Sequence, residues 1–162
     1  MQSSVNLTPE RLMAQWTGAT HKLQVNLHNF EVKAGKAAVA IFKQSFAMKR
    51  FNSHNARPWA SWQGNYKGKG ELMQEHGILK NSIKVKSIQN HAVTVFTDPN
   101  SFNNPLQRHP GFCYAAVHNN LRYLDTPPPR GPKRERQFIG HSTLLLDELH
   151  QLSLHIFDGF PK

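Results

Sequence analysis

Histidine is the residue type in this sequence whose abundance could support metal chemistry, but its spacing does not. The chain has ten histidines and a single cysteine. Metal ligands on one element usually lie three or four residues apart on a helix, or two apart on a strand. His150 and His155 are five apart, and His21 and His28 are seven apart. The sequence therefore predicts no metal site and no cofactor.

Other catalytic arrangements are equally poorly supported. His118-Asn119-Asn120 resembles part of an HNH nuclease motif, but no further histidines follow at the required spacing. Cys113 lies beside an apolar run, which is typical of a packed core residue. The carboxylates are scattered, so no acid–base pair stands out, and Gly68-Lys69-Gly70 lacks the spacing of a phosphate-binding loop. We expect a protein that is not an enzyme.

Two segments near the C-terminal third favour a subunit contact instead. Tyr114-Ala115-Ala116-Val117-His118-Asn119 is an apolar, strand-like run, and Arg134-Glu135-Arg136-Gln137-Phe138-Ile139-Gly140-His141-Ser142 opens a helix. Between them lies a polar, basic loop that contains Pro127-Pro128-Pro129. This arrangement holds no catalytic set, and it would suit a surface that meets another subunit.

The net charge of +10 is unevenly distributed. Residues 49–86 carry eight Lys and Arg against two Glu, and residues 121–137 carry five against two acids, whereas 138–162 is net acidic. A basic excess favours polyanionic partners. It equally fits an assembly in which the basic loop of one subunit meets the acidic helix of the next. Both interpretations stay open.

A loop rich in aromatic and cationic residues follows the first helices, with Trp59, Trp62 and Tyr66 among Arg57, Lys67 and Lys69. Such a loop could bind single-stranded nucleic acid by stacking, form a protein hot spot, or cover the core where a helix ends. The candidate interface residues are Arg57, Trp59, Trp62, Arg130, Lys133, Arg134, Arg136, Asp147 and Glu148.

The helices that would position these loops are predicted from caps and apolar spacing. Thr8-Pro9 begins a short helix that should end near Gly18, within an N-terminal arm of residues 1–19. A longer helix should run from about Thr20 to Phe51. Its apolar positions are spaced by four and three, which marks one helix face: Leu23, Leu27, Phe30, Ala34, Ala37 and Ile41. Gly35 would let a neighbouring element approach closely.

The remaining elements predict an α+β fold. Ser82–Lys86 and Ala92–Phe96 alternate polar and apolar residues around a turn at Gln89-Asn90. Phe112–Val117 is predicted as a third strand, and Ser142 as the cap of a final helix with Leu145, Leu149, Leu152 and Ile156 on one face. We expect one domain, 1–162, in which a long N-terminal helix and a C-terminal helix pack on a small antiparallel sheet, with extended loops at 52–70 and 121–137.

The expected core places Leu23, Leu27, Phe30 and Ile41 on the strand face that contains Ile83, Val85, Val93 and Val95, with the leucines of the final helix beside them. The lone cysteine, the short apolar runs and the absence of a signal-like N-terminus predict a cytoplasmic product with no membrane partner.

Several motifs, taken in order, resemble the tailed-bacteriophage virion-morphogenesis family of the Mu-like type, also called tail-completion, neck or head–tail joining proteins. That family has a long helix ending in Phe, a Trp-containing loop, L-x-x-(T/S)-G-x-L-x-x-S-I, A-V-x-V, Y-A-x-x-H, a basic loop, R-x-F-(L/I)-G-x-S and a final helix. The matching residues are Phe46, Trp59, Trp62, Leu72, Gly77 to Ile83, Ala92 to Val95, Tyr114 to Asn119 and Arg136 to Ser142.

The resemblance spans roughly residues 20–155 and implies a non-enzymatic virion subunit. Such a subunit would form a ring, for which we expect six copies, at the head–tail junction, assembled in the host cytoplasm. Its partners would be neck, connector or tail-tube proteins, with transient non-specific contact with genomic DNA. The chain departs from the family at His76, at Asn120-Leu121-Arg122 and in a longer 98–112, so the identity of the partners stays open. The alternative is a small basic nucleic-acid-binding protein, with Arg57, Lys67, Lys69 and Arg130–Arg136 as its footprint.

Overall fold

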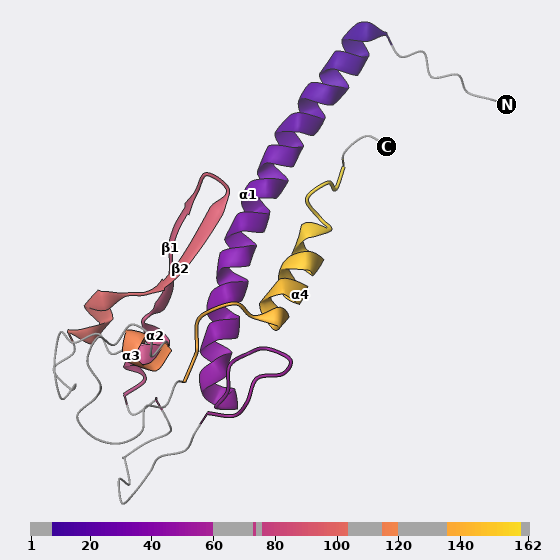
Figure 1. The fold of residues 1–162 in the computed structure, drawn as a ribbon. Coiled ribbons are helices and arrows are strands. Elements are labelled where there is room, and N and C mark those ends of the chain that lie inside the picture. Colours follow the sequence, from indigo (N-terminus) through magenta and orange to yellow (C-terminus); the bar gives the residue numbers. More distant parts are fainter. Residues whose placement is uncertain (1–7, 60–72, 74–75, 104–114, 120–135, 160–162) are drawn as a thin grey trace, which may run out of the picture.

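A computed structural model describes residues 8–59, 73, 76–103, 115–119 and 136–159. The fold class is α+β, as predicted: a long N-terminal helix and a C-terminal helix pack with a two-stranded antiparallel sheet. Figure 1 shows the hairpin and the C-terminal helix on opposite sides of the long helix. The elements are α1 (Pro9–Met48), α2 (Ile78–Asn81), β1 (Ile83–Gln89), β2 (Ala92–Thr97), the 3-10 helix η1 (Pro99–Phe102), α3 (Ala115–Asn119) and α4 (Thr143–Ser153).

Helix α1 is one continuous helix of 40 residues, so the predicted break near Gly18 is wrong. The predicted start is confirmed, because the Thr8 side chain accepts a hydrogen bond from the backbone N–H of Arg11 and Pro9 occupies the first turn. A single interior glycine costs a helix only about 1 kcal/mol relative to alanine. That cost is too small to stop a helix whose flanking residues continue it. The helix ends at Lys49, which adopts the left-handed conformation.

Helix α1 presents two different faces to its two neighbours. On the sheet side, a Cβ added to Gly35 would lie 3.0 Å from Val85 Cγ2 and 3.2 Å from Val93 Cγ1, so the expected close approach at this glycine is confirmed. On the other side, Phe30 lines a groove with Leu152 and Ile156. The expectation that the whole Leu23–Ile41 stripe covers the strands is therefore only partly correct.

The hairpin is irregular in a way that keeps one face towards α1. Val85 pairs with Val95 and Ile88 with Val93, with a bulge between Val85 and Ser87. In a regular strand, residues three apart face opposite sides. The extra residue of the bulge places Ile88 on the same, helix-facing side as Val85. The turn is Asn90-His91, one residue later than predicted, and both residues have positive φ, as a two-residue hairpin turn requires.

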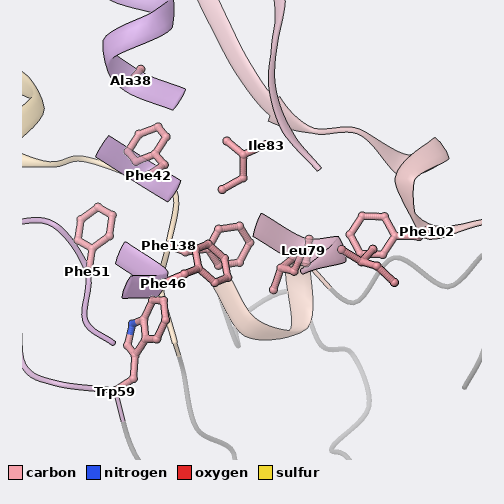
Figure 2. Packing of buried hydrophobic residues seen from close by; sticks show 11 residues of the cluster. Ala38, Phe42, Phe46, Phe51, Trp59, Leu79, Ile83, Phe102 and Phe138 are labelled. Carbon is pink, nitrogen blue, oxygen red and sulfur yellow. The ribbon is translucent and has the colours of Figure 1, made fainter. Parts of the chain in front are cut away.

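The main core lies at the C-terminal end of α1, where Phe46 and Phe138 meet between Trp59 and Leu79 (Figure 2). Phe46, Leu79, Ile83, Phe102 and Phe138 are all fully buried. The predicted third strand is wrong for its described part, because Ala115–Asn119 forms α3. A short apolar run does not by itself distinguish a strand from a buried helical turn.

Candidate interaction surface

The two sequence motifs that flank the basic loop are joined to each other by hydrogen bonds. The backbone N–H of Arg136 donates to the carbonyl of His118 at 2.8 Å. The side-chain oxygen of Asn119 accepts from the backbone N–H groups of Phe138 and Ile139, at 3.0 and 2.8 Å. His118 and Asn119 therefore lie side by side with residues 136–139.

The second motif is also fixed to the segment that follows α1. The indole Nε1 of Trp59 donates to the carbonyl of Gln137 at 3.0 Å, while the Phe138 ring lies 5.4 Å from that of Phe46. The Ser142 hydroxyl donates to the carbonyl of Asn52 and accepts from the Leu145 N–H at 3.2 Å, which confirms its predicted role as the cap of α4. These motif residues hold the fold together at the root of the basic loop.

His118 and Arg136 place two ionisable groups inside this junction. Arg136 is only 7% exposed. Burial, together with the nearby charge of Arg136, lowers the pKa of His118 from 6.5 to about 4. The imidazole is therefore neutral at physiological pH.

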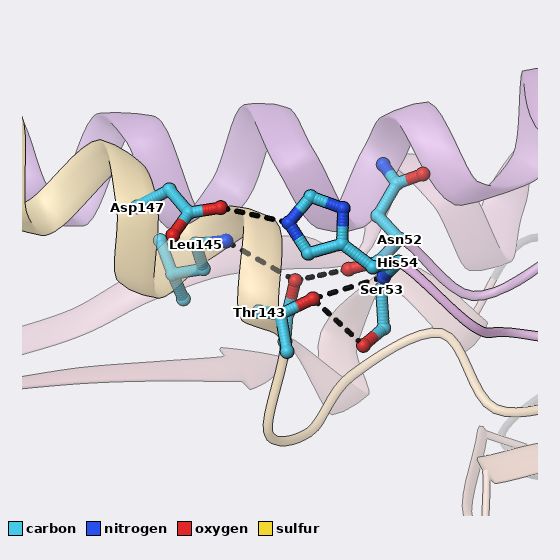
Figure 3. Close-up of polar contacts among 7 residues, drawn as sticks. Asn52, Ser53, His54, Thr143, Leu145 and Asp147 are labelled. Atoms are coloured by element: carbon cyan, nitrogen blue, oxygen red, sulfur yellow. Dashed lines mark hydrogen bonds and ion pairs between the residues drawn. The ribbon is translucent and has the colours of Figure 1, made fainter.

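A polar cluster near the start of α4 contains a hydroxyl, a histidine and an aspartate, the residue types of a catalytic triad (Figure 3). His54 Nε2 lies 2.9 Å from Asp147 Oδ2. The Thr143 hydroxyl, however, accepts from the backbone N–H of His54 at 2.9 Å and lies 3.0 Å from the Ser53 hydroxyl. Neither hydroxyl hydrogen-bonds to the imidazole, so no base is placed to activate a nucleophile. The cluster joins the segment after α1 to α4.

The candidate interface residues are placed very differently from one another. Trp59 is buried and packs edge-on against Phe46 with ring centroids 5.5 Å apart, as expected if it covers the core. Arg136 is buried as well, whereas Arg57 and Glu148 are exposed. Asp147 is exposed but paired with His54. Trp62, Arg130, Lys133 and Arg134 lie outside the described residues.

Helix α1 carries an exposed apolar surface that was not predicted from the sequence. The side chains of Leu12, Met13 and Trp16 are 38%, 72% and 50% exposed. Figure 1 shows this third of α1 extending beyond α4 and the hairpin. The signal was present in the sequence, because the three- and four-residue spacing of the stripe continues back from Leu23 through Ala19, Trp16 and Leu12. We call Leu12, Met13 and Trp16 the apolar tip.

The middle of the same stripe, around Phe30, lies against the α4 region of the protein itself. There Phe30 faces the groove of about 320 Å³ that α1 forms with Leu152 and Ile156 of the α4 region. Asn26 donates to the carbonyls of Ile156 and Asp158, at 3.1 and 3.0 Å, and fixes the end of this region against α1. The α1 stripe thus packs against a helical neighbour over its middle and exposes apolar side chains at its tip.

The described residues contain neither a metal site nor a membrane-spanning helix. Within the described ranges, no three histidine, cysteine or carboxylate side chains gather as a metal site would need. The helices of this same part of the chain include none that is long and apolar enough to cross a bilayer. Comparison with family models, curated proteins and solved structures finds no match to this chain.

Proposed function

We propose that this protein is a non-enzymatic structural subunit of a phage neck or tail-completion ring at the head–tail junction. The motif resemblance suggests this class of protein. The observation that carries the proposal is the apolar tip. Its residues Leu12, Met13 and Trp16 are exposed on the part of α1 that extends past the hairpin and α4. Exposed apolar side chains gathered on one projecting element are typical of an interaction surface.

A second copy of the chain is the occupant that best suits the apolar tip. The tip continues the stripe that already packs against the α4 region, and that region exposes Leu146, Leu154 and Phe157. A tip that docks on the α4 region of a neighbour would form a head-to-tail contact, and such contacts close into rings when the rotation permits. Full burial of a large apolar side chain contributes about 1.5–3 kcal/mol.

The double substitution Leu12→Ser with Met13→Ser should dissociate the ring. Six copies of 18.5 kDa would weigh about 111 kDa, a mass that native mass spectrometry or sedimentation can measure. We expect wild type near this mass and the double variant near that of a monomer, because two exposed apolar contacts of the tip are lost. Val25→Ser is the control, since Val25 is 46% exposed but lies on another face of α1.

Two outcomes would contradict the role of the tip. One is a wild-type chain that remains monomeric at micromolar concentration, and the other is a double variant that keeps the wild-type mass. Circular dichroism of both variants checks that α1 stays helical, which Thr8 and Pro9 should ensure because the cap is unchanged.

We expect Glu148 to strengthen the same ring contact by electrostatic attraction. It is exposed on α4 and forms no ion pair with another described residue, so it can meet the basic loop of a neighbour. Arg136 is not its partner, because that side chain is buried. Glu148→Gln should weaken the ring more in low salt than in high, since exposed charges are screened within about 10 Å at 0.1 M.

The control for Glu148→Gln is Gln89→Lys, which changes the net charge by the same amount at the far end of the hairpin. Sedimentation at 20 and 300 mM salt compares the two variants. Equal behaviour of both would show that net charge, rather than a contact at Glu148, controls assembly.

A small basic nucleic-acid-binding protein is the second candidate, and the net charge of +10 favours it. Base stacking on Trp59 is not part of that function, because the side chain is only 8% exposed. The two candidates differ in mass: a nucleic-acid-binding monomer or dimer would not reach the mass of a ring. In the preferred function, the partners are further copies of the chain and adjacent neck, connector or tail-tube proteins of the virion.

A further inference from the structure

The basic residues of α1 all lie on one face of the helix. They are Arg11, Lys22, Lys33, Lys36 and Lys43. At 100° per residue they fall within an arc of about 80°. Its two acidic residues lie elsewhere: Glu10 is in the first turn, and Glu31 faces the hairpin, where it binds His91 at 2.8 Å. A helix face that is only solvated is stabilised by opposite charges three or four residues apart. A face that carries cations alone lacks such pairs.

We call this arc the basic face, and its other members are small or neutral. Between the cations lie Gln15, Gly18, Val25, Asn29, Ala40 and Ala47, all of them exposed. The arc therefore contains no carboxylate and no aromatic side chain. Among the described ion pairs, none involves a cation of this face. Lys22 and Lys33 border the end of the α4 region, because a Cβ on Gly159 would meet Lys22 Nζ and Lys33 lines the groove with Asp158. Both side chains are nevertheless exposed, as are Arg11 and Lys36, whereas Lys43 is half-buried. The exposed flank of these side chains can still meet a partner.

The spacing of three cations matches the geometry of a duplex. Arg11, Lys22 and Lys33 recur every eleven residues, which is about 16.5 Å along a helix that rises 1.5 Å per residue. One turn of B-DNA is about 34 Å, so a line drawn along its surface crosses one of the two backbones on average every 17 Å. A duplex lying along α1 would meet these cations with successive phosphate backbones.

We propose that the basic face of α1 binds the phosphate backbone of double-stranded DNA without reading its sequence. Lysine, arginine, asparagine and glutamine are among the side chains that contact the phosphates and sugars of DNA. Gly18 has no atom of the described protein within 4 Å of an added Cβ, so the duplex can approach the helix closely there. Single-stranded DNA suits the face less well, because its binding depends on aromatic stacking.

This inference is consistent with the proposed ring, through which a genome would pass, but it does not depend on ring closure. Backbone contacts alone give weak, salt-sensitive binding that lets DNA slide. DNA binding and oligomer mass are separate measurements, so each proposal can fail while the other stands. Neck assembly would be expected to persist when the basic face is neutralised, since the apolar tip is unchanged.

The test compares two triple variants of the full chain that lose the same charge. Arg11→Gln with Lys22→Gln and Lys33→Gln neutralises the basic face, whereas Arg50→Gln with Arg57→Gln and Lys86→Gln neutralises exposed cations elsewhere. Fluorescence anisotropy with a 30-base-pair duplex of mixed sequence (an experimental choice that exceeds the roughly 14 base pairs spanned by the face) measures affinity between 50 and 200 mM salt.

Wild type with about five phosphate contacts should lose about 500-fold in affinity over that salt range, and the basic-face variant only about 10-fold. The control variant should keep nearly the wild-type dependence. Lys36→Gln with Lys43→Gln is a second, independent variant, expected to reduce the slope of log affinity against log salt by about 1.8. Thermal unfolding confirms that each variant is folded.

Several results would overturn the proposal. Absence of duplex binding by wild type would do so, as would equal loss in the two triple variants, which would indicate diffuse net charge. Tighter binding of single-stranded DNA, or equal competition by polyglutamate or by vesicles of anionic lipid, would show that the partner is not duplex DNA. Binding that depends on sequence at 200 mM salt would also contradict a backbone-only contact.

Discussion

Replacing Phe46 with alanine is expected to lower the free energy of unfolding by about 3–5 kcal/mol, the range measured for buried Phe to Ala changes. Phe46 is fully buried where α1 meets the segments on either side of the basic loop. Its ring contacts Trp59 edge-on at 5.5 Å and Phe138 at 5.4 Å. The substitution removes both ring contacts and leaves a cavity that side chains from three distant segments cannot easily fill.

Urea denaturation of the two proteins would measure this change. Val25→Ala is the control, because Val25 is 46% exposed, lies outside the proposed ring contact and should alter stability by no more than about 0.5 kcal/mol. The Phe46 effect should appear in the midpoint and not in the slope of the transition, which reports surface exposed on unfolding. A loss below about 1 kcal/mol for Phe46→Ala would mean that this cluster is not the centre of the core.

Acidification should destabilise the protein through His118. Burial, with the charge of Arg136, holds the pKa of His118 at about 4 in the folded state, against 6.5 for an ordinary histidine. Between these values the unfolded chain binds a proton that the folded chain does not, so stability falls as pH falls. The contribution is fully present above pH 6.5 and is lost between 6.5 and about 4, amounting to about 3 kcal/mol.

His118→Gln should remove this pH dependence, because glutamine does not titrate. The free energy of unfolding of wild type and variant would be measured by urea denaturation from pH 7.5 to pH 4. His141→Gln is the control, since His141 is exposed and should leave the decline unchanged. If the His118 variant loses as much stability on acidification as wild type, the buried imidazole is not the group responsible.

Both substitutions act on the same structural junction, which links the core to the proposed assembly function. His118 and Asn119 bind the backbone of 136–139, and Phe138 packs on Phe46. The junction therefore holds residues 118–119 and 136–139 together. Protonation of His118 destabilises this junction. If the proposed ring uses the basic loop to meet a neighbouring subunit, we therefore expect the ring to weaken below pH 6.

Local patterns in the sequence determined most of the elements. The cap at Thr8-Pro9, the cap at Ser142 and the hairpin around residue 90 depend on neighbours a few residues away, and each lies where or within one residue of where it was predicted. The stripe on α1 was recognised for the same reason, since helical periodicity is a local property. The α+β class follows from those elements.

The candidate site could be predicted much less well, because burial depends on distant segments. Trp59 and Arg136 have the residue types of an interface, yet Trp59 hydrogen-bonds to a residue 78 positions away and Arg136 packs beside His118. Nothing near either residue in the sequence specifies those neighbours. The apolar tip was not predicted, because a regular apolar stripe on a helix is typical of a face that packs in the core. Only the packing of other segments decides which part of the stripe is covered.

The sequence by itself determined the caps, the periodic faces, the hairpin and the charge of each segment, since short-range sterics and hydrogen bonds act within a few residues. Only the tertiary structure decided that α1 continues through Gly18, that Ala115–Asn119 is helical, and which apolar and basic side chains stay exposed. Those outcomes depend on packing between segments far apart in the chain, where the free energy of burial outweighs weak local preferences.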